Sequence, residues 1–409
     1  MLRMVLGLFV SVAVARYLGP KDFGLYSYVL SIIALVGVVT NLGLQNLAKR
    51  ELVEQPERRD VIMGTCFVLS LLAGVVAYAA MLLIVGLATD RSLLLGLFAL
   101  LGGTLLLNPL KCIEIWFQSQ VRSDLSVTAS SIASVLFASI KISAIYFEAD
   151  LLHFAYIFLS ETAVLTVLQV FFYQRHFGRL FAWRADLSLA KEFLKQSWPL
   201  LLSGLAVMIY IKVDQIMLGA ILGDEAVGQY SVAVRISSIW YFIPTILATS
   251  LFPAILNARK QSVQLYEQRL QRYFDLNTSL AYLICIPLTL AAPWIIAILF
   301  GAEYEAAAPI LAIHAWSSLF VFLGVARGEY FIAEKLFKFS FVCTALGAVT
   351  NISMNFFFIP LYGGKGAALT TLFSFAVSGL LTSIFLVGNR PVFRLQLLSL
   401  ISPRVFFKK

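Results

Sequence analysis

Charged residues are scarce in this sequence. Asp, Glu, Lys and Arg make up 13% of its 409 residues, whereas hydrophobic residues make up 60%. Because a soluble domain carries about 25% charged residues, the composition excludes a soluble globular protein. Apolar runs of about twenty residues recur along the whole chain, and this length predicts membrane-spanning helices rather than a barrel of short strands. The predicted fold class is all-α integral membrane.

Motifs of soluble enzymes and metal sites are also missing. The chain has no Walker A, HExxH or GxSxG segment, its four cysteines lack CxxC spacing, and His153, His176 and His314 are scattered. We expect the cysteines to be small packing residues and His314 to be a hydrogen-bonded packing residue. The expectation is therefore a protein without enzymatic activity, metal or cofactor, in which any transport is coupled to H⁺ or Na⁺ or driven by substrate supply.

Long polar stretches are absent, so the apolar runs divide almost the whole chain into helices. Pro109 predicts a kink, and residues 258–272 space apolar side chains as an amphipathic helix on the membrane surface does. We predict twelve spanning helices, at about 5–15, 25–47, 61–87, 92–117, 124–147, 151–174, 197–221, 227–256, 274–299, 305–325, 337–359 and 364–387.

One motif occurs twice, half a chain apart. The segment LGPKDFGLYS at Leu18–Ser27 returns as LGDEAVGQYS at Leu222–Ser231, an offset of 204 residues. Each copy separates two apolar runs, and glycines permit the positive φ of a tight helix–helix turn. The predicted structural residues of this turn motif are Gly19, Gly24, Tyr26, Gly223, Gly228 and Tyr230.

The repeat predicts two six-helix lobes. They comprise residues 1–174 and 197–388, joined by a cytoplasmic linker at 175–196 and followed by a basic cytoplasmic tail at 389–409. In the second half the helix before the turn begins near Ser197, so the repeat places the equivalent start upstream of Met1. We therefore expect the first helix to be incomplete, in preference to the signal peptide that Val5–Ala15 resembles.

Positive charges alternate along the predicted topology. The connections after even-numbered helices and the tail hold most of the 31 Lys and Arg residues, whereas those after odd-numbered helices hold Arg16, Lys21, Arg91 and Lys365. By the positive-inside rule the even connections and both termini are cytoplasmic. The net charge of +9 thus reflects topology and predicts no nucleic-acid partner.

Charged side chains inside predicted helices mark candidate sites, because they are costly at membrane depth. Lys111 and Glu114 stand three residues apart, and we interpret them as neutralising one another. Lys141, Lys212 and Arg235 have no acidic partner three or four residues away. They are our candidates for a cationic cavity that binds a phosphate or pyrophosphate; the alternative is that these long side chains extend to the interface.

Two deep acids are candidates for a coupling-ion site. Asp214 and Glu161 are carboxylates within predicted helices, the usual ligands of H⁺ or Na⁺ in transporters. Asp214 also has an alternative role, as the structural partner of a lysine on a neighbouring helix. Subtracting 204 maps Lys212 and Asp214 onto Leu8 and Val10, so the two halves share a scaffold but differ in chemistry.

Three blocks of the sequence resemble one transporter family. Residues Ala15–Leu52, Lys212–Ile236 and Leu299–Leu311 (LFGAEYEAAAPIL) are similar in order to Wzx-type polysaccharide flippases of the multidrug/oligosaccharidyl-lipid/polysaccharide exporter superfamily. Asn41 departs from the pattern, because relatives often carry an acidic residue there. The resemblance implies two lobes that rock around a central cavity and move an undecaprenyl-pyrophosphate-linked oligosaccharide from the cytoplasmic to the periplasmic leaflet of a bacterial inner membrane.

The same resemblance implies partner proteins, and two alternative functions remain. A polysaccharide polymerase and a chain-length regulator are implied partners, alongside the lipid-linked substrate and membrane lipids. A cation-coupled multidrug exporter of the same superfamily is the nearest alternative, although deep bases outnumber deep acids here. A membrane enzyme of polysaccharide assembly is a further alternative, which the short connections on the periplasmic side disfavour.

Overall fold

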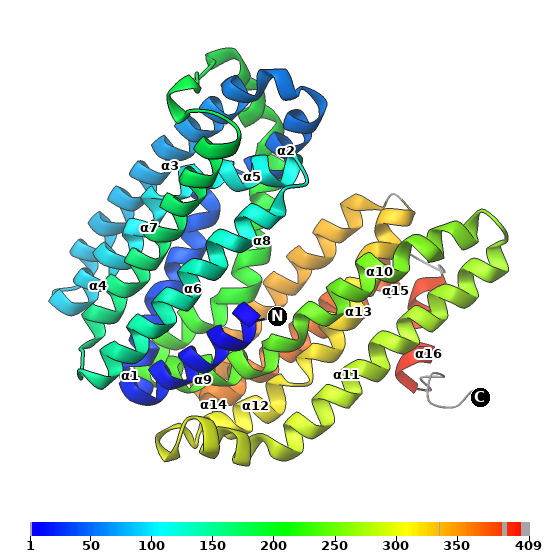
Figure 1. The fold of residues 1–409 in the computed structure, drawn as a ribbon. Helices are drawn as coiled ribbons and strands as arrows, with labels where there is room; N and C mark the ends of the chain where they lie inside the picture. Colours follow the sequence, from blue (N-terminus) through cyan, green and yellow to red (C-terminus); the bar gives the residue numbers. More distant parts are fainter. Residues whose placement is uncertain (1, 335, 387–390, 402–409) are drawn as a thin grey trace. The chain divides into compact units, whose positions relative to one another are not determined.

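The computed structural model describes residues 2–334, 336–386 and 391–401, which form helices joined by short connections (Figure 1). The all-helical prediction is confirmed. The helices are α1 Leu2–Thr40, α2 Leu44–Glu54, η1 Pro56–Arg58, α3 Arg59–Ala88, α4 Ser92–Gly102, η2 Gly103–Leu106, η3 Asn108–Lys111, α5 Cys112–Ser119, α6 Ser123–Tyr146, α7 Leu151–His176, η4 Leu180–Ala182, α8 Leu187–Leu222, α9 Asp224–Ser238, η5 Ile239–Tyr241, α10 Phe242–Arg259, α11 Val263–Leu299, η6 Ala302–Tyr304, α12 Ala307–His314, α13 Ser317–Ala333, α14 Phe337–Ala376, the π-helical η7 Val377–Leu381, α15 Thr382–Leu386 and α16 Pro391–Ile401.

Within the described residues, ten helical segments are long and apolar enough to cross a membrane. Two of them, Val5–Thr40 and Phe339–Ile384, each contain a glycine with non-helical backbone, Gly19 (φ 72°) in α1 and Gly363 (φ 59°) in α14. Each of these long segments is therefore a pair of helices joined by a glycine turn. Divided at these turns, the ten segments give the twelve predicted helices.

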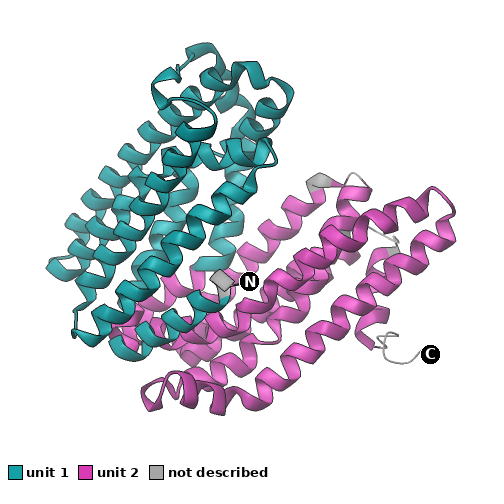
Figure 2. Cartoon of the chain, viewed as in Figure 1, with its two compact units in different colours: residues 1–18, 25–212 teal, residues 19–24, 213–409 magenta. Residues whose placement is uncertain are grey.

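Contacts divide the chain into two compact units (Figure 2). Unit 1 comprises Met1–Leu18 and Leu25–Lys212, and unit 2 comprises Gly19–Gly24 and Val213–Lys409. They differ from the predicted lobes in two places. Gly19–Gly24 of the first turn motif belongs to unit 2, and α8 begins inside the predicted linker and remains part of unit 1 as far as Lys212.

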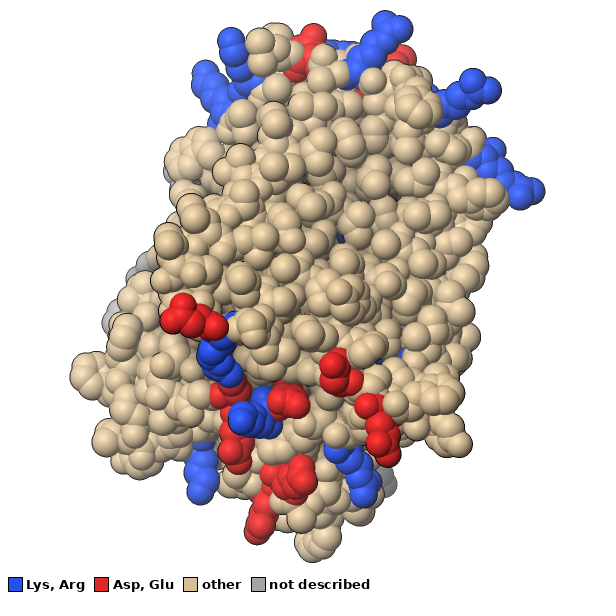
Figure 3. All heavy atoms as spheres, turned by 90° about the vertical axis from the view of Figure 1, so that its left-hand side faces the viewer, with Lys and Arg blue, Asp and Glu red and all other residues tan. Residues whose placement is uncertain are grey.

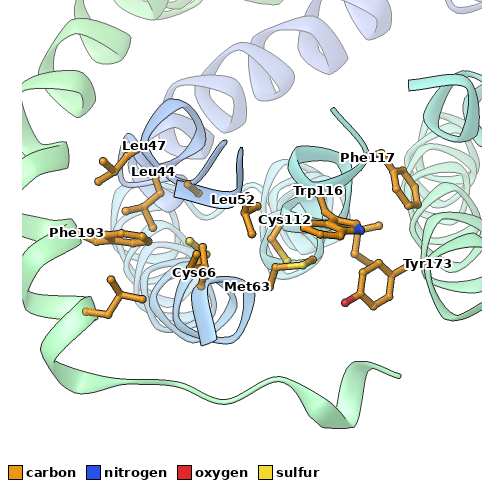
Figure 4. Close-up of a cluster of buried hydrophobic side chains, with 14 of the residues drawn as sticks. Leu44, Leu47, Leu52, Met63, Cys66, Cys112, Trp116, Phe117, Tyr173 and Phe193 are labelled. Atoms are coloured by element: carbon orange, nitrogen blue, oxygen red, sulfur yellow. The ribbon is translucent and has the colours of Figure 1, made fainter. Parts of the chain in front are cut away.

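The core of unit 1 contains two of the four cysteines. Cys66 of α3 and Cys112 of α5 are buried in a cluster with Trp116 and with Tyr173 of α7 (Figure 4). Cys285 and Cys343 are likewise buried and free, in unit 2. All four thus pack as small side chains, as predicted.

The C-terminal end of unit 2 corrects one prediction. Within the predicted basic tail, α16 is a helix whose Val392 and Gln396 are fully buried. The Gln396 side chain donates to the carbonyl oxygen of Gly379 in η7 at 2.9 Å, and Ser399 accepts from Thr278 of α11 at 3.0 Å. These polar contacts bind α16 to unit 2, so this part of the chain is not a loose tail; residues 389–390 and 402–409 lie outside the described residues.

Two further predictions are wrong, for the same physical reason. Residues 263–272 are the first turns of α11 rather than a separate surface helix, and Tyr266 and Leu270 are buried in the core of unit 2. Arg327, assigned to a connection, lies inside α13 at 5% exposure, where it donates to Thr382 at 2.9 Å and stacks on Phe331. In α11 and α13, tertiary packing buries residues that the sequence pattern assigns to the surface because charged or polar residues stand next to them.

The two copies of the turn motif have the same backbone conformation. Gly19 has φ 72° and ψ 171°, and Gly223 has φ 89° and ψ −175°. Gly301, which precedes η6, adopts φ 89° and ψ −179° as well. This region of conformational space is accessible essentially to glycine alone, which explains the residue type at all three turns.

The two turns also touch each other, within unit 2. A Cβ atom added to Gly24 would lie 1.8 Å from the carbonyl oxygen of Asp224, and one added to Gly228 would lie 1.9 Å from that of Pro20. Gly24 and Gly228 are equivalent in the repeat, as are Pro20 and Asp224. The contact is therefore reciprocal, and it requires a glycine on both sides.

We predict that Gly228→Ala destabilises the protein, because the methyl group must displace the backbone of the opposite turn. The expected loss is about 1–3 kcal/mol, measured as a fall in unfolding temperature of the detergent-purified chain. Gly328→Ala in α13 is the matched control, since nothing lies within 4 Å of its added methyl group. Equal stability of the two variants would contradict the close contact.

Candidate functional site

Asp214 lies in a buried polar cluster of unit 2. It is carried by α8 and is 2% exposed. Its Oδ1 atom accepts a hydrogen bond from Asn355 Nδ2 at 2.7 Å, and its Oδ2 atom accepts from Tyr230 at 2.8 Å and from Thr371 at 2.5 Å. The donors come from α9 and from both arms of α14, so the carboxyl group joins four helical segments.

A second layer of side chains holds these donors in place. Asn355 also donates to Asn351 at 3.1 Å and accepts from Thr370. Asn351 in turn donates to Ser374 at 3.3 Å, and Thr371 reaches the Ala367 carbonyl oxygen at 2.9 Å. All of these side chains are buried. Fixed rotamers of this kind keep a binding site in one geometry.

The cluster is rich in oxygen atoms that a small cation prefers. Carboxylate, amide, hydroxyl and backbone carbonyl oxygens converge there, and such oxygens bind hard cations. Intramembrane carboxylates of this kind also serve in proton relays. In the structure the carboxyl group accepts three hydrogen bonds, and its role as a site for H⁺ or Na⁺ stays a prediction.

Sequence reasoning did not identify the partners of Asp214. Asn351 and Asn355 stand four residues apart in a run of apolar residues, and Thr370, Thr371 and Ser374 follow on the next helical arm. Their spacing on one helix face was the available signal. Tyr230, predicted as a structural residue of the turn motif, is also one of the donors.

The equivalent tyrosine in the first half has different surroundings. Tyr26 packs edge-on against Phe158 with ring centroids 6.4 Å apart. In this first half of the chain, Val10 occupies the position that is equivalent to Asp214 in the repeat. His314, for its part, contacts Ser237 at 2.8 Å and the Tyr230 ring at 6.0 Å, in keeping with its predicted packing role.

Lys141 and Glu161 form an ion pair in unit 1. Lys141 Nζ on α6 lies 2.5 Å from Glu161 Oε2 on α7, and both side chains are mostly buried, at 20% and 24% exposure. From sequence these residues have separate predicted roles, because the spacing of charges within one helix does not reveal a partner on another. The structure brings them together as one neutral pair.

The other predicted cations have different environments. Arg235 on α9 is exposed and its guanidinium lies 5.8 Å from the ring centre of Phe23 in the first turn motif. Lys212 is half-buried on α8 and ends unit 1. On the face drawn in Figure 3, Lys and Arg predominate at the end where Figure 1 places α2, and a broad uncharged surface separates them from the charges at the other end.

Comparisons with known proteins identify relatives in glycan transport. The sequence matches the family described as "Polysaccharide biosynthesis protein" over residues 1–259 and the family "MatE" over residues 199–357. It is similar to the probable flippase AglR of Haloferax volcanii, with 24% identity over 72% of this chain and 65% of that protein. It also matches the probable low-salt glycan biosynthesis flippase Agl15 of the same organism, with 24% identity over 48% of this chain and 42% of that protein. The chain thus spans less than two thirds of the length of either relative.

Solved structures share the fold. An inward-facing multidrug resistance MATE family transporter of the MOP superfamily superposes with a TM-score of 0.80 at 15% identity, covering 96% of this chain and 95% of that one. The lipid II flippase MurJ in an inward closed conformation gives 0.74 at 17% identity, covering 99% and 90%. These likenesses confirm the predicted fold class.

We predict that Lys141 and Glu161 stabilise unit 1 as a pair. Lys141→Met alone leaves a mostly buried carboxylate without its partner, which costs about 1–3 kcal/mol. The double variant Lys141→Met/Glu161→Gln removes both charges and is expected to recover part of this loss. Thermal unfolding of the two single variants and the double variant in detergent measures the coupling. Losses that simply add would contradict the interaction.

Proposed function

The chain belongs to the polysaccharide biosynthesis protein family, and we propose that it is a flippase that moves lipid-linked oligosaccharides across a membrane. The observation that carries this proposal is the family match over residues 1–259, the larger part of the chain. Similarity to two probable flippases points to the same activity.

The proposed cargo is an undecaprenyl-pyrophosphate-linked oligosaccharide repeat unit. It moves from the cytoplasmic to the periplasmic leaflet of a bacterial inner membrane, with both termini of the protein in the cytoplasm. Alternating access moves the sugar and pyrophosphate across the membrane, while the lipid tail stays in the bilayer. A polysaccharide polymerase and a chain-length regulator act on the delivered product.

The cationic residues of the proposed cavity bind the pyrophosphate. Lys212 and Arg235 supply charge and N–H donors to its oxygens. Lys141 is bound to Glu161, so it contributes when the pyrophosphate displaces that carboxylate. In this scheme Glu161 positions Lys141 and does not bind the coupling ion.

Asp214 is the proposed coupling site. Its oxygens and those of Asn355 and Thr371 bind Na⁺ or exchange H⁺, and the site closes around the ion by drawing α8, α9 and α14 together. Because these helices carry the second turn motif and its partners, occupancy of the site changes the packing of unit 2. That change is the proposed link between the ion gradient and cargo movement.

A multidrug exporter is the second candidate function, favoured by the likeness to MATE transporters. Such an exporter needs an acidic group that a cationic drug can reach. Here Glu161 is paired with Lys141 and Asp214 is enclosed by three donors. We therefore favour the oligosaccharide cargo, and unaltered drug resistance of cells that overexpress the chain is the expected result.

We predict that Na⁺ or H⁺ binding stabilises the purified protein and that Asp214→Asn, which keeps the side-chain volume, abolishes the effect. An ion at about 100 times its Kd raises the unfolding free energy by about 2.7 kcal/mol. Unfolding temperatures measured over Na⁺ concentration and pH detect this, with Thr371→Ser as the control that retains the hydroxyl. Insensitivity of the unaltered protein to both ions would overturn the coupling site.

We predict that deletion of the gene leaves lipid-linked oligosaccharide facing the cytoplasm. Intact cells are treated with a periplasmic glycosidase, and the protected fraction of the lipid-linked pool is measured. This fraction is expected to rise on deletion and to fall on complementation with the full chain. A pool that remains fully accessible in the deletion strain would contradict a flippase function.

A further inference from the structure

Two helices of unit 1 are interrupted near one another. Between α1 and α2, Leu42 and Gly43 adopt left-handed conformations with φ of 50° and 68°. Between α4 and α5, the segments η2 and η3 replace regular α-helix over residues 103–111. Irregular backbone at membrane depth is tolerated where it is buried in protein or lines a water-filled cavity. Interrupted helices form the binding sites of many transporters.

The two interruptions are in direct contact. Asn108 in η3 donates to Thr40, the last residue of α1, at 2.8 Å, and both side chains are buried. A cavity of about 20 Å³ lies beside this bond. Its polar lining residues are Asn41, Gln45, Ser70, Asn108 and Lys111.

The first interruption is fixed by the packing of α8. A Cβ atom on Gly43 would lie 2.7 Å from the carbonyl oxygen of Ser197 and 2.6 Å from the nitrogen of Leu201. Gly43 therefore lies against the α8 backbone and needs both a positive φ and the absence of a side chain. Packing against α8 therefore stabilises the interruption, which is not explained by low helix propensity alone.

Lys111 lies at the second interruption and is exposed. Within the part of the chain that the structure describes, its ammonium group makes no hydrogen bond, and no carboxylate lies within 4 Å of it. The attraction to Glu114 predicted from sequence is present: Lys111 has helical backbone angles at the start of α5, and the Glu114 carboxylate three residues further along acts on its ammonium electrostatically from beyond 4 Å. Lys141 and Arg327, by contrast, are bound to Glu161 and Thr382.

We propose that Lys111, with the side-chain amides of Asn41 and Gln45, binds the phosphoryl head group of the polyprenyl-linked cargo as it enters from the cytoplasmic leaflet. This inference rests on the proposed function and adds a loading site to it. An ammonium and two amides donate to the phosphate oxygens, while the positive charge repels cationic ligands. The cavity has room for about one water molecule and is too small for a phosphate, so the phosphate lies at its mouth, where Lys111 and Gln45 are exposed.

The position of Lys111 suits a first contact with cargo. Ser119, the end of α5, lies eight positions further along the chain, a rise of about 12 Å. The charge alternation assigns that end to the cytoplasm. A head group that leaves the cytoplasmic leaflet thus meets Lys111 before it reaches residues nearer the opposite end.

The test measures binding of three probes to the full-length protein in nanodiscs. Farnesyl diphosphate and farnesyl monophosphate carry the head group of the two possible cargo types, and farnesol lacks it. Lys111→Ala is expected to weaken diphosphate binding about tenfold to a hundredfold and to leave farnesol binding unchanged. Lys111→Arg restores binding, and Lys49→Ala, which removes an exposed lysine of α2 without touching the cavity lining, is the control.

Export in a complemented deletion strain separates the possible outcomes. Loss of both binding and export in Lys111→Ala, at normal membrane abundance and with recovery in Lys111→Arg, supports the site. Unchanged binding and export in Lys111→Ala overturn the site and leave the flippase function standing. Failure of the unaltered protein to prefer either phosphate over farnesol, with normal export in the deletion strain, overturns the function and the site with it.

Discussion

In hydrocarbon, each backbone amide and carbonyl must find its hydrogen-bond partner within the protein. This constraint makes the described chain helical, and it makes every departure from a helix costly. Two examples show how the structure accommodates such departures. At η7 the π-helical turn coincides with a carbonyl that accepts from Gln396 of α16, and at Gly19 and Gly223 the turn conformation is one that glycine adopts without steric cost.

Both candidate sites include side chains carried by interrupted helices. Asp214 draws donors from both arms of α14, which are joined at the break of Gly363. Lys111 lies where α4 passes into α5 through two short 3-10 segments. In regular helix, side chains are spaced evenly around the axis, whereas a break brings polar groups from neighbouring helices to one point. The apolar helices thus form the scaffold, and polar side chains of the interrupted helices form the candidate sites.

Much of the fold could be predicted from sequence, because apolar run length and the repeated glycine frame are local signals. The turns at Gly19 and Gly223 and the break at Pro109 follow from such signals. The ion pair of Lys141 with Glu161 and the donors around Asp214 could not be found in this way, since they join side chains of different helices, and the spacing within one helix does not reveal such contacts. Arg327 and α16 were misassigned because polar residues in a membrane protein can be buried by pairing with one another, which composition does not reveal.

The reciprocal contact between the two turns has a consequence for the origin of this chain. Gly24 faces the carbonyl of Asp224, and Gly228 faces that of Pro20, the equivalent residue. An interface in which position i meets j while j meets i is the signature of a two-fold dimer of identical subunits. A half-length ancestor that paired with itself would make this contact twice, with one glycine serving both sides. Gene fusion would then have freed each half to diverge, and a buried carboxylate in the second half alone, where the first half has Val10, would be consistent with that divergence.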